Sequence, residues 1–296
     1  MSTPDHAIRE SSFVNRLADL FGSSSRRWQN MVTPCAYPDC KRKSVQYSFA
    51  RRLDGVDVGG EWVCSPPCYE AALLRQFNSV IVTRKQPRAV RKARLPLGLM
   101  FLSRGEVTEA QLTEALQEHR STGARLGDIL LQKKFVTEQQ VTTALAAQWG
   151  HPTFRSNSAI TWLPVRVPLY LVELHRIVPL HFVESSRTLL LGFADGPDHR
   201  LLSVLQRMLN CSVDACFITM SEYQRRLQFL MTEKRLHEVV FDRVCPPVEM
   251  ARICASYVGK LGSRRVHHSV CGEHLWVRMS GHKNDVDLLF RHNAPA

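Results

Sequence analysis

The clearest pattern of apolar positions along the chain is a doubled one, repeated at a spacing of 29 residues. The segment 97–119, LGLMFLSRGEVTEAQLTEALQEH, aligns without gaps on the segment 126–148, LGDILLQKKFVTEQQVTTALAAQ. In both copies apolar residues recur three and four positions apart, the period of a helix face packed on a core. Thr108 precedes Gln111, and Thr137 precedes Gln140, by three residues, which predicts a capping box in each copy. We therefore expect two stacked copies of a helix, a turn and a helix.

After Pro152 the pattern becomes a mixture of helices and strands. The expected elements there are a hairpin of 177–183 and 189–194, a helix from Asp198 to about Leu209, a strand over 212–218, and a helix that Ser221 caps and that runs into Leu230. From Pro246 we expect a helix over 248–261 and three strands over 264–270, 274–279 and 285–290.

The start of the chain gives a weaker pattern. Residues 1–12 predict disorder, and the apolar stripe within 13–28 predicts a short amphipathic helix. Residues 35–68 indicate short strands and turns, and 69–77 a helix. The segment 83–94, TRKQPRAVRKAR, has six basic residues and no acidic one, which is typical of an exposed linker.

Composition narrows the class of protein. With 296 residues and 44% hydrophobic content, the chain can form two or three modest domains. It contains no apolar run of the roughly 18 residues that a membrane span needs, and its first residues lack the pattern of a secretory signal. These features predict a cytoplasmic protein.

The net charge of +12 is concentrated in the first third of the chain. Residues 1–96 hold 16 Lys and Arg against 8 Asp and Glu, whereas the remaining residues hold 23 against 19. This asymmetry indicates an anionic partner for the first third, such as nucleic acid, an acidic protein or a membrane surface. An ordinary solvated basic surface explains it equally well.

Four of the nine cysteines have the spacing of a metal site. Four residues separate Cys35 from Cys40, three separate Cys64 from Cys68, and 23 lie between the pairs. Four thiolates delivered by two turns suit tetrahedral zinc, and such a closed site is structural because no position is left for water. The alternative is four unrelated reduced cysteines. The other five cysteines are expected to be buried apolar residues.

These patterns together predict an α+β chain of six segments. They are a disordered start and amphipathic helix (1–30), a zinc-ribbon-like module with four cysteine ligands (31–82), a basic linker (83–94), a tandem helical repeat (95–152), a small α/β subdomain (153–232) and a C-terminal α/β module (233–296).

The stretch from Leu97 to about Leu230 resembles the N-terminal domain of the ATPases of type II secretion and type IV pilus assembly. The resemblance rests on the doubled LG-x-x-L-x-x-x-G-x-V-T-x-x-Q-L pattern, the QWGHP junction at 148–152, VPL at 178–180 and FADGPD at 193–198. It covers a little under half of the chain. It implies a helical repeat followed by a small α/β subdomain, and a partner in the secretion or pilus assembly machinery.

One branch of this family binds cyclic di-GMP through two copies of a motif that reads Arg-Leu-Gly, then apolar pairs flanking a Gly, then Leu, Leu and Gln. The second copy here has Val141 as a conservative change and Lys134 in place of Gly; its matching residues are Arg125, Leu126, Gly127, Leu130, Leu131, Phe135, Val136, Leu145 and Gln148. In the first copy Pro96 replaces the Arg and His119 replaces the Gln; its matching residues are Leu97, Gly98, Gly105, Val107, Leu112 and Leu116.

The resemblance therefore implies a cyclic di-GMP site with one intact copy of the motif and one altered copy. A guanidinium can donate two hydrogen bonds to a phosphate or to a guanine edge, and a glycine lets the backbone approach a ligand. Arg94 could replace the missing guanidinium. The implied binding residues are Arg125, Leu126, Gly127 and Gln148, with Leu97, Gly98 and His119 contributing more weakly and Val141, Leu145, Leu112 and Leu116 completing the site. The alternative is that the Leu-Gly positions only shape helix packing, as in family members that dock a membrane-anchored partner.

No catalytic pattern accompanies these motifs. The ATPases of the family continue into a phosphate-binding loop, and no segment here fits G-x-x-x-x-G-K-[ST]. We expect a regulatory or adaptor protein without enzymatic activity. Two rival interpretations are a docking adaptor of a secretion or pilus machine with no nucleotide ligand, and a nucleic-acid-binding protein that uses the zinc module and the basic linker.

Overall fold

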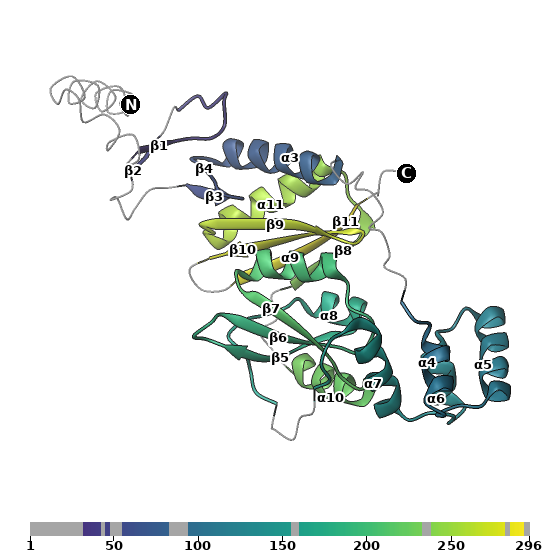
Figure 1. The fold of residues 1–296 in the computed structure, drawn as a ribbon. Helices are drawn as coiled ribbons and strands as arrows, with labels where there is room; N and C mark the ends of the chain where they lie inside the picture. The colour runs from purple at the N-terminus through teal and green to yellow at the C-terminus, as the bar shows by residue number, and fades with distance from the viewer. Residues whose placement is uncertain are drawn as a thin grey trace, which may run out of the picture. The chain divides into compact units, whose positions relative to one another are not determined.

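The computed structural model describes residues 32–42, 45–47, 55–82, 94–154, 160–232, 238–281 and 285–292 (Figure 1). The disorder expected over 1–12 and the amphipathic helix expected within 13–28 lie outside these residues, as does the linker expected over 83–94 except for its last residue. The chain forms two compact units, one made of residues up to 80 with 246–267 and 279–284, the other of the remainder. No helix within the described ranges is long and apolar enough to cross a membrane.

The first unit begins with two short antiparallel strand pairs. Strand β1 (Val32–Pro34) pairs with β2 (Val45–Tyr47), and β3 (Val56–Val58) pairs with β4 (Glu61–Val63). Helix α3 (Pro66–Val82) follows, extending at both ends the helix that the sequence predicts over 69–77. Its first position is a proline, which fits the first turn because the missing N–H would have no partner there. Helix α11 (Pro247–Leu261) also belongs to this unit (Figure 1).

A six-stranded sheet includes strands from distant parts of the sequence. Its order is β4, β3, β9 (Arg265–Cys271), β10 (His274–Ser280), β11 (Asp285–Arg291) and β8 (Glu238–Val244). Strand β3 runs parallel to β9, and β8 runs parallel to β11. The three predicted strands β9 to β11 are present, whereas β8 is an element that the sequence analysis missed. The segments 31–82 and 233–296, treated above as separate modules, therefore both supply strands to one sheet.

The doubled sequence pattern folds as predicted into four helices. They are α4 (Leu97–Ser103), α5 (Glu109–Thr122), α6 (Leu126–Gln132) and α7 (Glu138–Trp149). Both capping boxes are confirmed, with the cap hydroxyls accepting from the Gln111 and Gln140 amides at 3.2 and 3.3 Å. Helices α5 and α7 both end at a glycine with φ of 70°. The two copies share one apolar core, which includes Phe101, Ala115, Ile129, Leu130 and Ala144.

A three-stranded sheet follows the repeat, with the order β5 (Ile177–Val183), β6 (Thr188–Phe193) and β7 (Ser212–Phe217). Strands β5 and β6 form the predicted hairpin, and β7 runs parallel to β6. The helices of this subdomain are α8 (Leu169–His175), α9 (His199–Leu209) and α10 (Met220–Met231). Helix α8, which begins directly after Pro168, is not among the elements expected from the sequence.

The start of α10 corrects one sequence prediction. Thr219, and not Ser221, caps this helix, because the Thr219 hydroxyl accepts from the Glu222 amide at 3.2 Å. The Ser221 hydroxyl instead donates to a carboxylate oxygen of Glu138 at 2.8 Å. Ser221 therefore links α10 to the start of α7, a role that the local sequence pattern does not reveal.

Candidate ligand pocket and cysteine cluster

Arg125 occupies the position just before α6, where its backbone is extended (φ −70°, ψ 139°). Its side chain is 59% exposed and forms an ion pair with Asp195, which follows β6. Asp195 also lies 3.5 Å from the Arg176 guanidinium, and Arg176 lies 3.9 Å from Asp128. Two guanidinium groups and two carboxylates thus meet where the repeat contacts the α/β subdomain.

A cavity of about 150 Å³ opens beside this charged group. Its walls come from the first residue of α4, from Arg125 and helix α6, from α7, from the segment after β6 and from the first residue of α10. The lining residues are Leu97, Arg125, Leu126, Gly127, Asp128, Leu131, Glu138, Val141, Thr142, Leu145, Ala194, Asp195 and Met220. The cavity therefore combines an aliphatic wall with one guanidinium and several carboxylates.

The two motif glycines have different surroundings. A Cβ atom on Gly98 would lie 2.8 Å from Leu112 Cδ1 and 3.3 Å from Leu126 Cδ2. A Cβ atom on Gly127 would meet nothing closer than Val141 Cγ1 at 3.5 Å, an ordinary contact. A side chain at 98 would thus force Leu112 to shift, so helix packing favours a glycine there, whereas neither packing nor a positive φ requires one at 127.

The last polar residue of each motif contacts a backbone carbonyl in the segment that precedes the first helix of the other copy. His119 Nδ1 lies 2.5 Å from the carbonyl oxygen of Ala124, just before α6. Gln148 Nε2 donates to the carbonyl oxygen of Leu95, just before α4, at 2.7 Å. The two contacts are equivalent under the 29-residue repeat. His119 can therefore take over from the expected Gln as a structural tie.

The structure divides the predicted binding residues into two groups. Six line the cavity: Leu97, Arg125, Leu126, Gly127, Val141 and Leu145. The others lie elsewhere: Leu112 and Leu116 belong to the shared core, Gly98 is packed beneath Leu112, and His119 and Gln148 form the two ties.

Arg94, the residue suggested as a substitute for the missing first-copy guanidinium, contacts Trp149. Its guanidinium stacks over the ring of Trp149, 3.3 Å from the centroid. Asp128, Glu138 and Asp195 also line the cavity, although the sequence motif does not include them. Asp195 lies within the FADGPD segment of the resemblance, but only the folded chain brings it to Arg125.

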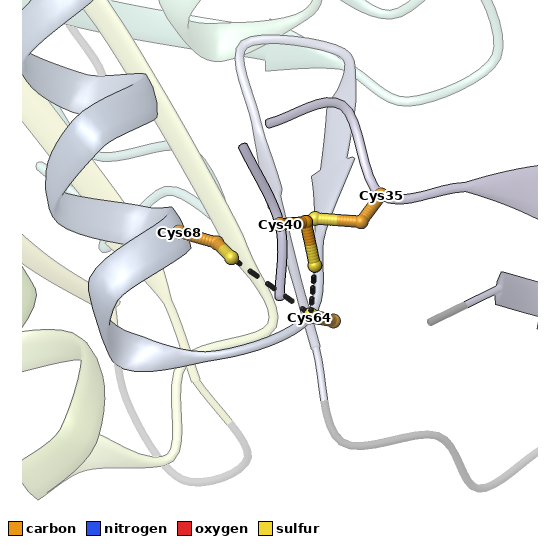
Figure 2. A group of neighbouring side chains, drawn as sticks. All are labelled: Cys35, Cys40, Cys64 and Cys68. Atoms are coloured by element: carbon orange, nitrogen blue, oxygen red, sulfur yellow. Dashed lines mark hydrogen bonds between the residues drawn. The ribbon is translucent and has the colours of Figure 1, made fainter. Parts of the chain in front are cut away.

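The four predicted zinc ligands converge in the first unit (Figure 2). Cys35 follows β1, Cys40 lies in the next turn, Cys64 follows β4, and Cys68 lies in the first turn of α3. The turn is fixed by the Ala36 amide, which donates to the Trp62 carbonyl oxygen at 2.9 Å. All four sulfur atoms lie within 4.8 Å of one another, so the sequence prediction of their proximity is confirmed.

The spacing of the sulfur atoms fits a tetrahedral metal. A zinc–sulfur bond of about 2.3 Å places tetrahedral sulfur ligands about 3.8 Å apart. Cys40 Sγ lies 3.5 Å from Cys64 Sγ, which lies 3.9 Å from Cys68 Sγ (Figure 2). Burial raises the pKa of the Cys68 thiol to about 12 and also raises that of Cys35. Without a cation these thiols are protonated at neutral pH, and a dication would stabilise the thiolates.

The remaining cysteines match the sequence interpretation, since all five are buried: Cys211, Cys216, Cys245, Cys254 and Cys271. Burial raises the pKa of the Cys216 thiol to about 12 and also raises the pKa of Cys254. These groups are protonated at neutral pH and behave as small apolar side chains.

No protein-family model matches the chain. Two curated proteins are each 28% identical to it over 153 residues: bacteriophage adsorption protein B of Escherichia coli K12 and bacteriophage N4 adsorption protein B of Escherichia coli O157:H7. The match covers 48% of this chain but only 19% of each relative, so the chain spans about a fifth of their length.

Solved structures also resemble part of the chain. A structure of MshE with cyclic di-GMP is 24% identical, with a TM-score of 0.38, over 46% of this chain and 99% of that one. A structure of the N-terminal domain of XpsE is 15% identical, with a TM-score of 0.37, over 45% of this chain and 91% of that one.

Proposed function

We propose that this chain is a non-enzymatic cytoplasmic regulatory protein that binds cyclic di-GMP at the cavity of the second repeat. The observation that carries the proposal is the convergence of Arg125, Gly127 and an aliphatic wall on one cavity. Six residues of the second-copy motif line this cavity: Arg125, Leu126, Gly127, Leu131, Val141 and Leu145.

The side chains of the cavity suit a guanine nucleotide. The Arg125 guanidinium has five N–H donors in a planar fork, which match a phosphate or the O6 and N7 acceptors of guanine. Leu126, Val141 and Leu145 offer apolar surface to the flat face of a base. The Arg125 side chain is 59% exposed, so opening its ion pair with the less exposed Asp195 should cost on the order of 1 kcal/mol.

Gly127 supports a ligand more directly than Gly98 does. A glycine in a helix is less favourable than alanine by about 0.5–1 kcal/mol, so its presence needs a reason. At Gly98 the reason is contact with Leu112, whereas at Gly127 the neighbouring side chains leave room for a methyl group. Close approach of a ligand to the backbone explains the glycine at 127.

Isothermal titration of the full chain with cyclic di-GMP tests this function. We expect saturable binding by the wild type and a loss of at least about tenfold in affinity for Arg125→Ala, since a charged hydrogen bond contributes about 1.5–3 kcal/mol. Arg120→Ala is the matched control, because Arg120 is exposed and lies in α5, away from the cavity. Absence of saturable binding by the wild type rejects the function.

A second candidate is an adaptor that docks a component of a secretion or pilus assembly machine. The first copy favours it, because Leu95 and Leu99 are 56% and 48% exposed beside Pro96. Exposed apolar groups that lie together are typical of protein contacts. Co-purification of an identified machine component that Leu99→Asp abolishes and Arg125→Ala leaves intact supports this function. The reverse pattern rejects it.

The cysteine cluster is proposed to hold one structural zinc ion. Four thiolates would complete its coordination, so the ion would join the turn after β1 to the start of α3 and provide no open position for chemistry. The described residues 33–42, before β3, are exposed or half-buried, and a bound metal commonly supplies the missing folding free energy.

A further inference from the structure

We infer that the cavity recognises a single guanosine phosphate half of its ligand, so that linear and cyclic diguanylates bind alike. The inference rests on the proposed function, because it concerns the ligand of the same cavity. It follows from comparing each cavity residue with its counterpart 29 positions earlier in the first copy.

Pro96 and Arg125, the residues just before the first helix of each copy, share a backbone conformation but differ in side-chain chemistry. Pro96 before α4 has φ −57° and ψ 137°, and Arg125 before α6 has φ −70° and ψ 139°. Proline has neither a side-chain donor nor a backbone N–H. The first copy therefore cannot donate to a phosphate or to a guanine edge from this position, although its chain follows the same course.

The third residue of α6 also offers a polar side chain where the equivalent residue of α4 does not. Asp128 lines the cavity and offers a carboxylate, and its counterpart in the first copy is Leu99. Leu99 is 48% exposed and has no polar side-chain atom. Guanine N–H groups would find an acceptor in the second copy and an aliphatic chain in the first.

The glycines complete the contrast. Gly98 is buried, with Leu112 and Leu126 already occupying the space beside its Cα atom. At the equivalent position of the second copy, Gly127 lines the cavity, and the nearest side chains leave room beside it. A ligand can thus approach the backbone of α6, whereas an approach to α4 at the equivalent point would have to displace core leucines.

The size and lining of the cavity agree with this comparison. Its volume of about 150 Å³ lies below the roughly 300–1,000 Å³ of sites that enclose a whole small ligand. Leu97 is the one lining residue that the first copy contributes, against nine from the second. One half of a dinucleotide therefore enters the cavity while the other half stays on the solvent side.

Recognition of one half has a measurable consequence. A ligand held by both halves gains about 100- to 10,000-fold in affinity over a ligand held by one, provided that the geometry allows both contacts. When one half is held, closing the dinucleotide into a ring brings no such gain. The linear dinucleotide pGpG should then compete effectively with cyclic di-GMP.

Titration of the full chain with cyclic di-GMP and, separately, with pGpG tests the inference. We expect the affinity for pGpG to be less than about 100-fold below that for cyclic di-GMP. Saturable binding of cyclic di-GMP together with a deficit of about 100-fold or more for pGpG overturns the inference and leaves the proposed function standing. Failure of cyclic di-GMP to bind rejects the proposed function instead.

Leu99→Ala provides a second, independent measurement, because its exposed side chain can be shortened without disturbing the core. If the first copy makes no contact with nucleotide, this variant changes the affinity for cyclic di-GMP by less than about threefold. A larger loss overturns the inference, since it places the ligand on the first copy as well.

Discussion

Lys134 and Gly105 occupy equivalent positions in the two repeats and share a left-handed backbone, with φ of 59° and 67°. Each follows the end of a short helix, and the amides at 134 and 135 donate to the Leu131 and Leu130 carbonyl oxygens, both at 2.9 Å. This hydrogen-bond pattern terminates a helix with a left-handed residue, which is usually glycine. Lys134 adopts this conformation in spite of its side chain.

Lys134→Gly should stabilise the chain by up to about 1 kcal/mol, because a left-handed conformation costs a residue with a Cβ atom about 1–2 kcal/mol and part of the gain is lost to a more flexible unfolded state. Urea denaturation measures the change. Gly105→Ala is the mirror control and should destabilise by a similar amount, since the space around Gly105 is open and backbone strain is the main effect. An unchanged midpoint for both variants contradicts the prediction.

The second prediction concerns the stability of variants at the two motif glycines, Gly98 and Gly127. Gly98→Ala should destabilise the chain by about 1–3 kcal/mol, because the added methyl group overlaps Leu112 in a packed core. Gly127→Ala should leave stability equal or slightly higher, since its new contacts are ordinary and alanine favours a helix by up to about 1 kcal/mol. Thermal unfolding of the two variants in parallel decides the matter. Equal losses of stability would show that both glycines serve packing alone.

The sequence predicted the repeat well because its information is local. Capping boxes and apolar positions three and four apart depend on residues within one helix, and the structure confirms them at Thr108 and Thr137. The convergence of Cys35, Cys40, Cys64 and Cys68 was also predictable, because the required ligand chemistry restricts the residue types and their spacing.

The missed features depend on contacts between distant residues. Asp195 reaches Arg125 across 70 positions, and Ser221 reaches Glu138 across 83. Strand β8, whose side chains are half-buried or exposed, lacks the apolar run of the central strands. Strand β8 forms because it pairs with β11, a contact that its own sequence does not indicate. Patterns of neighbouring residues do not predict contacts between residues so far apart in the sequence.

Removal of the metal is the third prediction. Purified protein should contain about one zinc ion per chain by elemental analysis, and Cys68→Ser should lose it, because three thiolates bind far more weakly than a closed set of four. Cys211→Ala is the control, since Cys211 is buried outside the cluster. In wild-type protein a strong chelator should remove amide protection from the segment around β3, β4 and α3. Full protection in the absence of metal contradicts a structural role.

Acid should weaken the fold through two histidines, the buried His274 and the half-buried His175. Burial, followed by Arg291, lowers the pKa of His274, and burial also lowers the pKa of His175. These groups bind a proton more readily in the unfolded chain than in the folded one. Above the ordinary histidine pKa they therefore have no effect on stability. As the pH falls through that pKa, they lower the free energy of unfolding. Urea midpoints between pH 7.5 and 5 should therefore decrease toward acid. His274→Gln, which keeps a polar group near the Tyr170 hydroxyl, should reduce the slope. An unaltered slope in this variant would assign the effect to other groups.

Two ion pairs in the C-terminal strands should respond very differently to the loss of a carboxylate. Arg278 and Asp287 form a buried bidentate pair with distances of 2.7 and 2.8 Å, and Asp287 also accepts from the Trp276 indole. Asp287→Asn leaves the guanidinium buried without a counter-charge, so it should destabilise by about 3–5 kcal/mol.

The exposed pair of Arg291 and Glu273 is the matched comparison for this last prediction. Its atoms lie 3.4 Å apart and both side chains are at least half exposed, so Glu273→Gln should change stability by less than about 1 kcal/mol. Equilibrium denaturation of both variants at the same pH and salt concentration gives the two values directly. Similar effects of the two substitutions would mean that water reaches Arg278 in solution, because only a solvated guanidinium tolerates the loss of its partner at so small a cost.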